Sequence, residues 1–260
     1  YIANNSLLSA YRLTNNEKYL SAAIKCADWV MTSSQPNGLV PFGYNIDSME
    51  WVTDHNIVDI GFTAGLFCEL YKITKEEKYK KFAIDFSESY IKSFYDKNVG
   101  LFATYINSRG EKRGGYFSRG QAWALEGLIP VYEICSDNKI FDLIEKQALI
   151  ICHHQLGNGG WPCNFQGIRQ LMGEDCKGIS CIAKSLLNWS RLSNHRETLE
   201  KAVEAACHWC ETHTDEKTGM ILSYSTDGAI EHSQNTSTGM LYANAYAIET
   251  LHALMDGRPI

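Results

Sequence analysis

The chain has 260 residues, of which 45 % are hydrophobic, so it can bury the core of one large domain, which we take to be residues 1–260. Its net charge is −6 and its Lys and Arg residues are scattered, which argues against nucleic acid or an anionic membrane as a partner. No apolar run reaches the roughly 18 to 20 residues that a transmembrane helix needs, so we expect a soluble protein with no membrane partner.

Helical hairpins are predicted from a repeat that starts at Tyr11, Tyr71, Tyr132 and, in a looser copy, Ser190. The starts lie 60, 61 and 58 residues apart. Each copy joins the end of one helix to a second, amphipathic helix through a short turn that contains Asn, Asp or Ser. A glycine loop repeats in phase with the helices and is followed by a short β-prone run, at Gly38, Gly100, Gly160 and Gly219.

The apolar segments that precede each repeat start are more uniformly hydrophobic than the second helices, as expected of an inner ring wrapped by an outer one. These segments are 1–13, 55–73, 118–134, 174–192 and 236–254. The pattern predicts an all-α fold, an (α/α)6-type toroid. Five inner and four outer helices are fewer than the usual six pairs, so we expect N-terminal helices to be missing from this sequence.

Nine cysteines, an odd number, fall mostly inside apolar helical patterns, which favours reduced core thiols over disulfides. Reduced thiols favour a cytoplasmic location. A periplasmic one stays open, because the true N-terminus is not visible in a sequence that begins inside a helical pattern. "CHWC" at 207–210 and "CHH" at 152–154 contain zinc-ligand residue types, but both fall on predicted outer helices without a second pair at ligand spacing, so we expect no metal.

Polar residues at the N-terminal ends of the inner helices are predicted to line one pocket, because these ends face the same mouth of a toroid. Asp59 lies 12 residues before its repeat start, and the same offset falls beside Arg119 in the next repeat and near Asp175 in the one after. Arg119 offers a guanidinium fork that suits a carboxylate on a ligand. Its neighbours Phe117 and Trp123 offer flat walls for a sugar ring.

The stretch "FSRGQAW" at 117–123 resembles the W-x-R-G-Q-A-W signature of the unsaturated glucuronyl hydrolases, glycoside hydrolase family 88. The likeness extends along most of the chain. "DIGFTAGLFCELYKITKEEKY" at 59–79 resembles the family's Asp-bearing inner helix, and "EDCKGISCIAKSLL" at 174–187 has the spacing of its later D-S-S-A-x-A-I-A segment.

Members of this family hydrate the 4,5 double bond of an unsaturated uronic acid at the end of an oligosaccharide that a polysaccharide lyase has produced. They need no cofactor. The resemblance implies that Asp59 is the general acid and base and that Arg119 meets the uronate carboxylate. It further implies that Trp123 and Phe117 flank the sugar rings and that Gln121 orients polar groups from the same helix.

The sequence departs from the family at three places. The offset that gives Asp59 would put the family's second carboxylate at position −1, before the first residue. The loop "YINSRGEKRGGYFS" at 105–118 lacks the family's His, and Phe117 stands where the signature has Trp.

Each candidate side chain also has a structural interpretation. Asp59 would then be a buried carboxylate satisfied by backbone groups or by Arg119, and Asp175 would cap its helix. Asp54 would be a helix N-cap with His55 as its neighbour. Alternatively, His55 lies one helical turn before Asp59 and orients or titrates that acid, or contacts substrate.

Two further functions stay open. One is another toroid enzyme, such as an inverting glycosidase, a lyase or a sugar epimerase. An inverting glycosidase needs two carboxylates about 6.5 to 9.5 Å apart, for which the sequence offers Asp59 and Asp175. The other is a degenerate toroid that binds sugar or protein without turnover.

Overall fold

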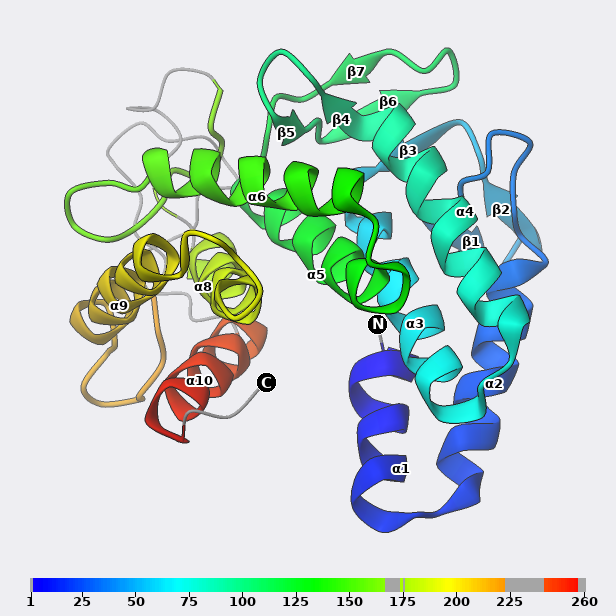
Figure 1. The fold of residues 1–260 in the computed structure, drawn as a ribbon, viewed down its shortest axis with the longest axis horizontal. Coiled ribbons are helices and arrows are strands. Elements are labelled where there is room, and N and C mark those ends of the chain that lie inside the picture. Colours follow the sequence, from blue (N-terminus) through cyan, green and yellow to red (C-terminus); the bar gives the residue numbers. More distant parts are fainter. Residues whose placement is uncertain (1, 167–173, 175, 223–240, 257–260) are drawn as a thin grey trace. The chain divides into compact units, whose positions relative to one another are not determined.

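The computed structural model describes residues 2–166, 174, 176–222 and 241–256 (Figure 1). The chain forms two compact units. The first holds Tyr1–Asp96, Phe102–Arg113 and Trp123–Phe141. The second holds Lys97–Leu101, Gly114–Ala122 and Asp142–Ile260.

The first unit contains two helical hairpins. In one, a π-helical stretch, η1 (Ala3–Leu8), continues into α1 (Ser9–Thr14) and packs against α2 (Glu17–Met31). In the other, α3 (Thr63–Thr74) packs against α4 (Glu77–Phe94) (Figure 1). Most of α5 (Ser118–Cys135) also belongs to this unit.

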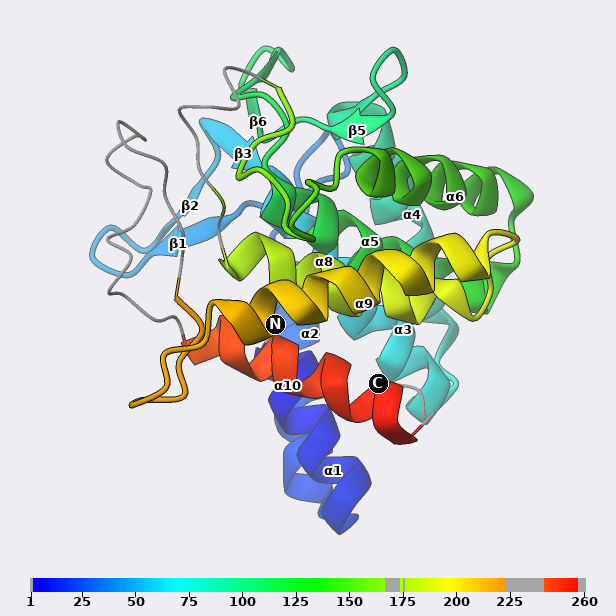
Figure 2. The same cartoon turned by 90° about the vertical axis from the view of Figure 1, so that its left-hand side faces the viewer.

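The second unit is helical as well. It holds most of α6 (Asn138–His153), together with α8 (Cys176–Ser190), α9 (Arg196–Thr212) and α10 (Leu241–Asp256). Helix α8 packs against both α9 and α10, which run alongside each other in Figure 2. No described helix is long and apolar enough to cross a membrane.

Matching backbone hydrogen bonds in three of the turns confirm the hairpin repeat. Asn15, Lys75 and Ser136 each follow the first helix of a hairpin in the left-handed region, with φ of 51°, 61° and 53°. The N–H of each donates to the carbonyl of the Tyr that starts the repeat, at 2.7, 2.9 and 2.7 Å. The three turns are therefore the same αL helix end, built three times.

Two small antiparallel sheets belong to the first unit. Strand β1 (Gly43–Asn45) pairs with β2 (Glu50–Val52). The other sheet has the order β3-β6-β7, with strands His55–Ile57, Tyr105–Asn107 and Lys112–Arg113. Its register places Asn56 opposite Ile106. Two shorter strands, β4 (Tyr95–Asp96) and β5 (Leu101–Phe102), follow α4.

The prediction of one continuous inner helix over 55–73 is wrong for residues 55–62. Residues 55–57 are strand β3, residues 58–62 form a 3-10 helix, η2 (Val58–Phe62), and α3 begins only at Thr63. The cause is pairing with a distant strand: Ile57 is extended, with φ −115° and ψ 151°, and the Val58 N–H donates to the Thr104 carbonyl at 2.9 Å. The other inner segments are helical where the structure describes them, except in 174–192, where Glu174 is in an isolated β-bridge and residues 191–192 form a turn.

The nine cysteines are free thiols, of which Cys68, Cys176, Cys181 and Cys210 are buried and Cys26 is exposed. Burial raises the pKa of Cys210 to about 12, and burial likewise raises the pKa of Cys207 to about 11. Among the described residues, no group of three or more His, Cys, Asp or Glu side chains is placed to hold a metal ion.

Candidate active site

Asp59 lies on η2, the 3-10 turn that connects β3 to α3, and its side chain is half-buried. The first residue of this turn is fixed from two directions. The Val58 N–H donates to the Thr104 carbonyl at 2.9 Å, and the Val58 carbonyl accepts a hydrogen bond of 2.8 Å from the Tyr90 hydroxyl of α4. The backbone that carries Asp59 is therefore held by both the sheet and the outer helix.

Two glycines bring neighbouring elements into contact with the same turn. A Cβ at Gly61 would lie 2.5 Å from the Tyr90 Oη, and a Cβ at Gly127 of α5 would lie 2.0 Å from the Gly61 carbonyl oxygen. Neither distance leaves room for a side chain. Gly61 and Gly127 therefore allow α4 and α5 to pack directly on the Asp59 turn.

Tyr90 is the centre of an aromatic stack in the first unit. It is buried, and its ring lies 5.0 Å from that of Phe94 and 5.1 Å from that of Phe102. Burial raises the pKa of Tyr90 well above its ordinary value, and the nearby charge of Asp59 raises it further. The phenol therefore stays protonated and available as the donor to Val58.

Trp123 and Phe62 form an aromatic pair beside this turn. Their ring centroids are 5.7 Å apart at 70°, an edge-to-face contact, and Trp123 is buried. Because Phe62 is the last residue of η2, Trp123 supports the turn through that ring. The sequence predicts a sugar contact for Trp123, and its burial adds this packing role.

The second unit contains Phe117, Arg119 and Gln121. Phe117 and Arg119 are half-buried, and Phe117 pairs with Asn164 in an isolated β-bridge. Gln121 is fully buried, and the Gln147 Nε2 donates to its carbonyl at 3.1 Å and to its Oε1 at 3.4 Å. Gln121 therefore holds the first turn of α5 in place.

The start of α8 lies against the start of α5 in the second unit. A Cβ at Gly178 would be 2.2 Å from the Ser118 Oγ and 3.3 Å from the Arg119 N. The repeat offset that gives Asp59 in one repeat gives Gly120, beside Arg119, and Gly178 in the next two, so the last two of these segments are neighbours. Asp175, the remaining candidate on this segment, lies outside the described residues.

His55 does not have the helical relation to Asp59 that the sequence suggests, because residues 55–57 are a strand. Its Nδ1 lies 2.8 Å from the Asp54 Oδ1, and its ring lies 4.7 Å from that of Phe42. Asp54 caps neither helix of this segment, since η2 begins after Ile57 and α3 after Phe62.

Tyr90 and Glu174 were not among the residues singled out from the sequence. Glu174 accepts hydrogen bonds from the Asn158 Nδ2 at 2.9 Å and from the Trp209 Nε1 at 2.6 Å, which fixes its carboxylate beside a glycine loop. The sequence signal for Tyr90 is a hydroxyl within a stripe of phenylalanines at four-residue spacing on α4. A hydroxyl in an apolar stripe calls for a buried acceptor.

A family model, glycosyl hydrolase family 76, matches residues 7–113, less than half of the chain. No curated protein sequence gives a significant match. Solved structures are similar over nearly the whole chain. An unsaturated glucuronyl hydrolase from Bacillus sp. GL1, responsible for the degradation of glycosaminoglycan, has a TM-score of 0.80 at 14 % identity, covering 98 % of this chain and 73 % of that one.

A glycosyl hydrolase family 88 protein from Bacteroides vulgatus has a TM-score of 0.73 at 16 % identity, covering 96 % of this chain and 72 % of that one. A polysaccharide lyase has a TM-score of 0.71 at 17 % identity, with 98 % and 72 % covered. These likenesses confirm the predicted fold class, the (α/α) toroid type, and its resemblance to the unsaturated glucuronyl hydrolases.

Proposed function

We propose that the chain is a hydrolase that hydrates the 4,5 double bond of an unsaturated uronic acid at the end of an oligosaccharide. The observation that carries this proposal is the position of Asp59: a half-buried carboxylate on a turn that Tyr90, Thr104 and Gly127 hold in place. A general acid must be fixed against its substrate in this way to transfer a proton efficiently. The fold shared with unsaturated glucuronyl hydrolases and the stretch "FSRGQAW" add support.

In the proposed reaction, the Asp59 carboxyl gives its proton to C4, and the electrons of the C4–C5 double bond form the new C–H bond. Water bonds to C5 and returns a proton to the Asp59 carboxylate. The product is a hemiketal, which opens with cleavage of the glycosidic bond and releases the remaining saccharide as an alcohol. Protons balance, and Asp59 ends in the form in which it began.

The other candidates have proposed roles that follow their positions. Arg119 binds the uronate carboxylate through its guanidinium fork, and Phe117, half-buried beside it, lines a sugar ring. Gln121 and Trp123 are buried, so we assign them to positioning: Gln121 through Gln147, and Trp123 through Phe62. His55 and Asp175 stay proposed substrate contacts.

The test follows the ultraviolet absorbance of the conjugated uronate in a panel of lyase-generated disaccharides. Wild-type protein should remove the chromophore. Asp59→Asn keeps the shape of the side chain but cannot supply the proton, so the rate should fall by about 10²- to 10⁴-fold. Asp85→Asn is the matched control, because Asp85 is an exposed carboxylate on α4 paired with Lys81; it should leave the rate within about twofold.

Normal turnover by Asp59→Asn would refute the role of this carboxylate. The same assay separates the alternatives that the comparisons favour. A lyase, as in the similar polysaccharide lyase structure, would create the chromophore from intact polymer. A glycosidase of the kind that the family 76 match favours would release reducing ends from saturated oligosaccharides without changing the absorbance.

A further inference from the structure

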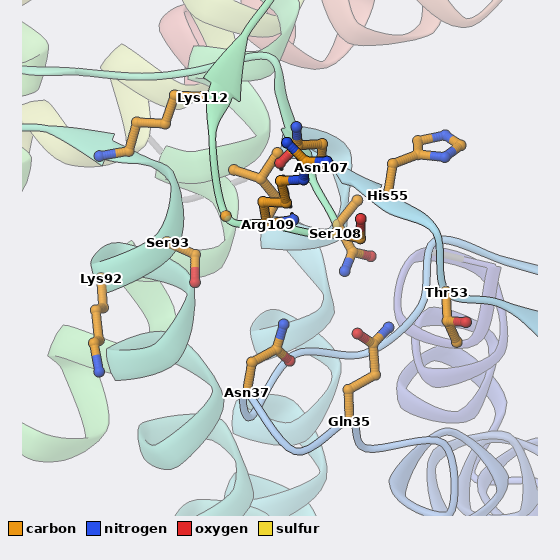
Figure 3. Close-up of a pocket in the computed structure, with 13 residues that line it drawn as sticks. Gln35, Asn37, Thr53, His55, Lys92, Ser93, Asn107, Ser108, Arg109 and Lys112 are labelled. Carbon is orange, nitrogen blue, oxygen red and sulfur yellow. Dashed lines mark hydrogen bonds between the residues drawn. The ribbon is translucent and has the colours of Figure 1, made fainter.

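A cavity of the first unit lies beside β3, the strand that leads into the Asp59 turn (Figure 3). Its volume is about 450 Å³, which suits a ligand of sugar size. Four segments build it: the loop after α2, strand β3, the end of α4, and the β6–β7 hairpin. Figure 3 shows Gln35 and Asn37 pointing toward the hairpin that carries Asn107, Ser108 and Arg109.

Two buried amide atoms in the wall of this pocket have no hydrogen-bond partner among the described residues. They are the Oδ1 of Asn56, an acceptor, and the Nε2 of Gln35, a donor. Asn56 is only 3 % exposed. An unpaired buried polar atom destabilises the folded state, so each needs an explanation. A sugar hydroxyl both donates and accepts, so a ring with several hydroxyls can satisfy both atoms once the two amide side chains rotate to face the cavity.

The charge of the pocket is positive. Its lining includes Lys92, Arg109 and Lys112 and contains no Asp or Glu. The Lys112 Nζ donates to the Tyr95 carbonyl at 2.8 Å, whereas neither Lys92 nor Arg109 has an ion-pair partner in the part of the chain that the structure describes. An oxyanion is the ligand group that an unpaired guanidinium binds best.

An aromatic ring adjoins the polar wall. Phe42 is 39 % exposed and lies against His55, which lines the pocket. Saccharide sites commonly combine such an apolar surface with a few fixed polar groups that set orientation. Amides that need a donor and an acceptor and an unpaired Arg therefore occur at one cavity, and an exposed ring contacts one of its lining residues.

We propose that this pocket binds a saccharide that carries a carboxylate or sulfate group. The hydroxyls meet Gln35 and Asn56, and the oxyanion meets Arg109, with Lys92 at the rim. The pocket adjoins the Asp59 turn, because its lining residues His55 and Asn56 are on β3, the strand that leads into η2, but the proposed binding does not depend on the chemistry at Asp59. It would hold an anionic sugar whether or not the chain turns that sugar over.

Calorimetric titration tests this proposal with four probes: a saturated uronate disaccharide, a sulfated disaccharide, a neutral disaccharide, and inorganic sulfate. One or both anionic disaccharides should bind at least tenfold more tightly than the neutral disaccharide and inorganic sulfate. Arg109→Ala should weaken their binding at least tenfold. Arg113→Ala is the matched control, because Arg113 is on the same hairpin but pairs with Glu111 at 2.7 Å; it should change binding less than twofold.

Asn56→Leu distinguishes a loss of ligand binding from a loss of folding. Replacing an unpaired amide with an apolar side chain of similar size should leave the thermal unfolding midpoint unchanged or higher, while binding of the anionic disaccharide falls at least tenfold. Binding at the Asp59 turn would survive both Arg109→Ala and Asn56→Leu, so unchanged affinity in these variants overturns the proposal. Sulfate that binds as tightly as the disaccharides also overturns it, because the pocket would then be an anion site without sugar recognition.

Discussion

At the scale of single residues, the hydroxyl of Tyr90 fixes the backbone of the turn that carries Asp59. Tyr90→Phe removes the hydrogen bond to the Val58 carbonyl and leaves that buried acceptor unpaired. We expect a loss of about 1 to 3 kcal/mol in the free energy of unfolding. Because the turn that carries Asp59 loosens, kcat for the unsaturated uronate should fall about tenfold with little change in KM, measured by the absorbance assay.

The control for Tyr90→Phe must remove stability without removing that bond. Phe86→Leu suits this purpose, because Phe86 is buried on the same face of α4 and its ring lies 6.0 Å from that of Tyr90. It should cost a similar free energy through lost packing while kcat stays near the wild-type value. Equal losses of kcat in the two variants would mean that Tyr90 acts only through stability.

At the scale of elements, the contact between α5 and η2 depends on Gly127. Alanine in place of a helical glycine ordinarily stabilises a helix by about 0.5 to 1 kcal/mol. At Gly127 the sign should reverse, because the new Cβ would lie 2.0 Å from the Gly61 carbonyl oxygen, a backbone atom that cannot rotate away. We expect Gly127→Ala to destabilise the protein by about 1 to 3 kcal/mol in urea denaturation.

Gly65 of α3 provides the comparison for Gly127. A Cβ there would meet the Asn4 Nδ2 at 3.4 Å and the Glu126 carbonyl oxygen at 3.5 Å, which are ordinary contacts. Gly65→Ala should therefore leave stability unchanged or raise it. If both alanine variants were destabilised equally, loss of chain flexibility or general crowding, and not the contact with Gly61, would explain the result.

The same elements show which parts of the fold can be predicted from the sequence alone. Tyr11, Tyr71 and Tyr132 predict the hairpin turns closely, because a helix end is encoded within a few residues. The segment at 55–62 is not predictable in this way, since its strand depends on β6, about 50 residues later. Asp59 can be selected as a candidate from the sequence, because it lies 12 residues before the repeat start Tyr71. Tyr90 and Asn56 cannot be assigned a role from the sequence, because their surroundings come from segments that are distant along the chain.

At the scale of the whole molecule, both units bury cysteine thiols, and the first also buries a tyrosine phenol. Because these groups are buried in their neutral form, they predict how the stability of the protein responds to high pH. Burial raises the pKa of Cys210 to about 12 in the second unit, and burial raises the pKa of Tyr90 and of Cys68 in the first. In the unfolded chain these groups ionise near their ordinary pKa values of about 9 to 10.

Above pH 9 the unfolded chain therefore binds fewer protons than the folded one, and stability falls as pH rises. The contribution of Cys210 is fully present below pH 9 and is lost progressively up to about pH 12. We expect a loss of about 1 kcal/mol per buried thiol between pH 8 and pH 10, measured as the midpoint of urea denaturation under reducing conditions.

Cys210→Ala should lower the midpoint at pH 7, where a packed side chain is lost, but it should also make the decline between pH 8 and pH 10 shallower. Cys26→Ala should change neither the midpoint nor the slope, because Cys26 is exposed. A midpoint that stays constant to pH 10 would mean that the buried thiols and Tyr90 ionise as readily in the folded chain as in the unfolded one. The same neutral phenol is the donor that holds the Asp59 turn, so a fall in kcat should accompany any ionisation of Tyr90 within the folded protein.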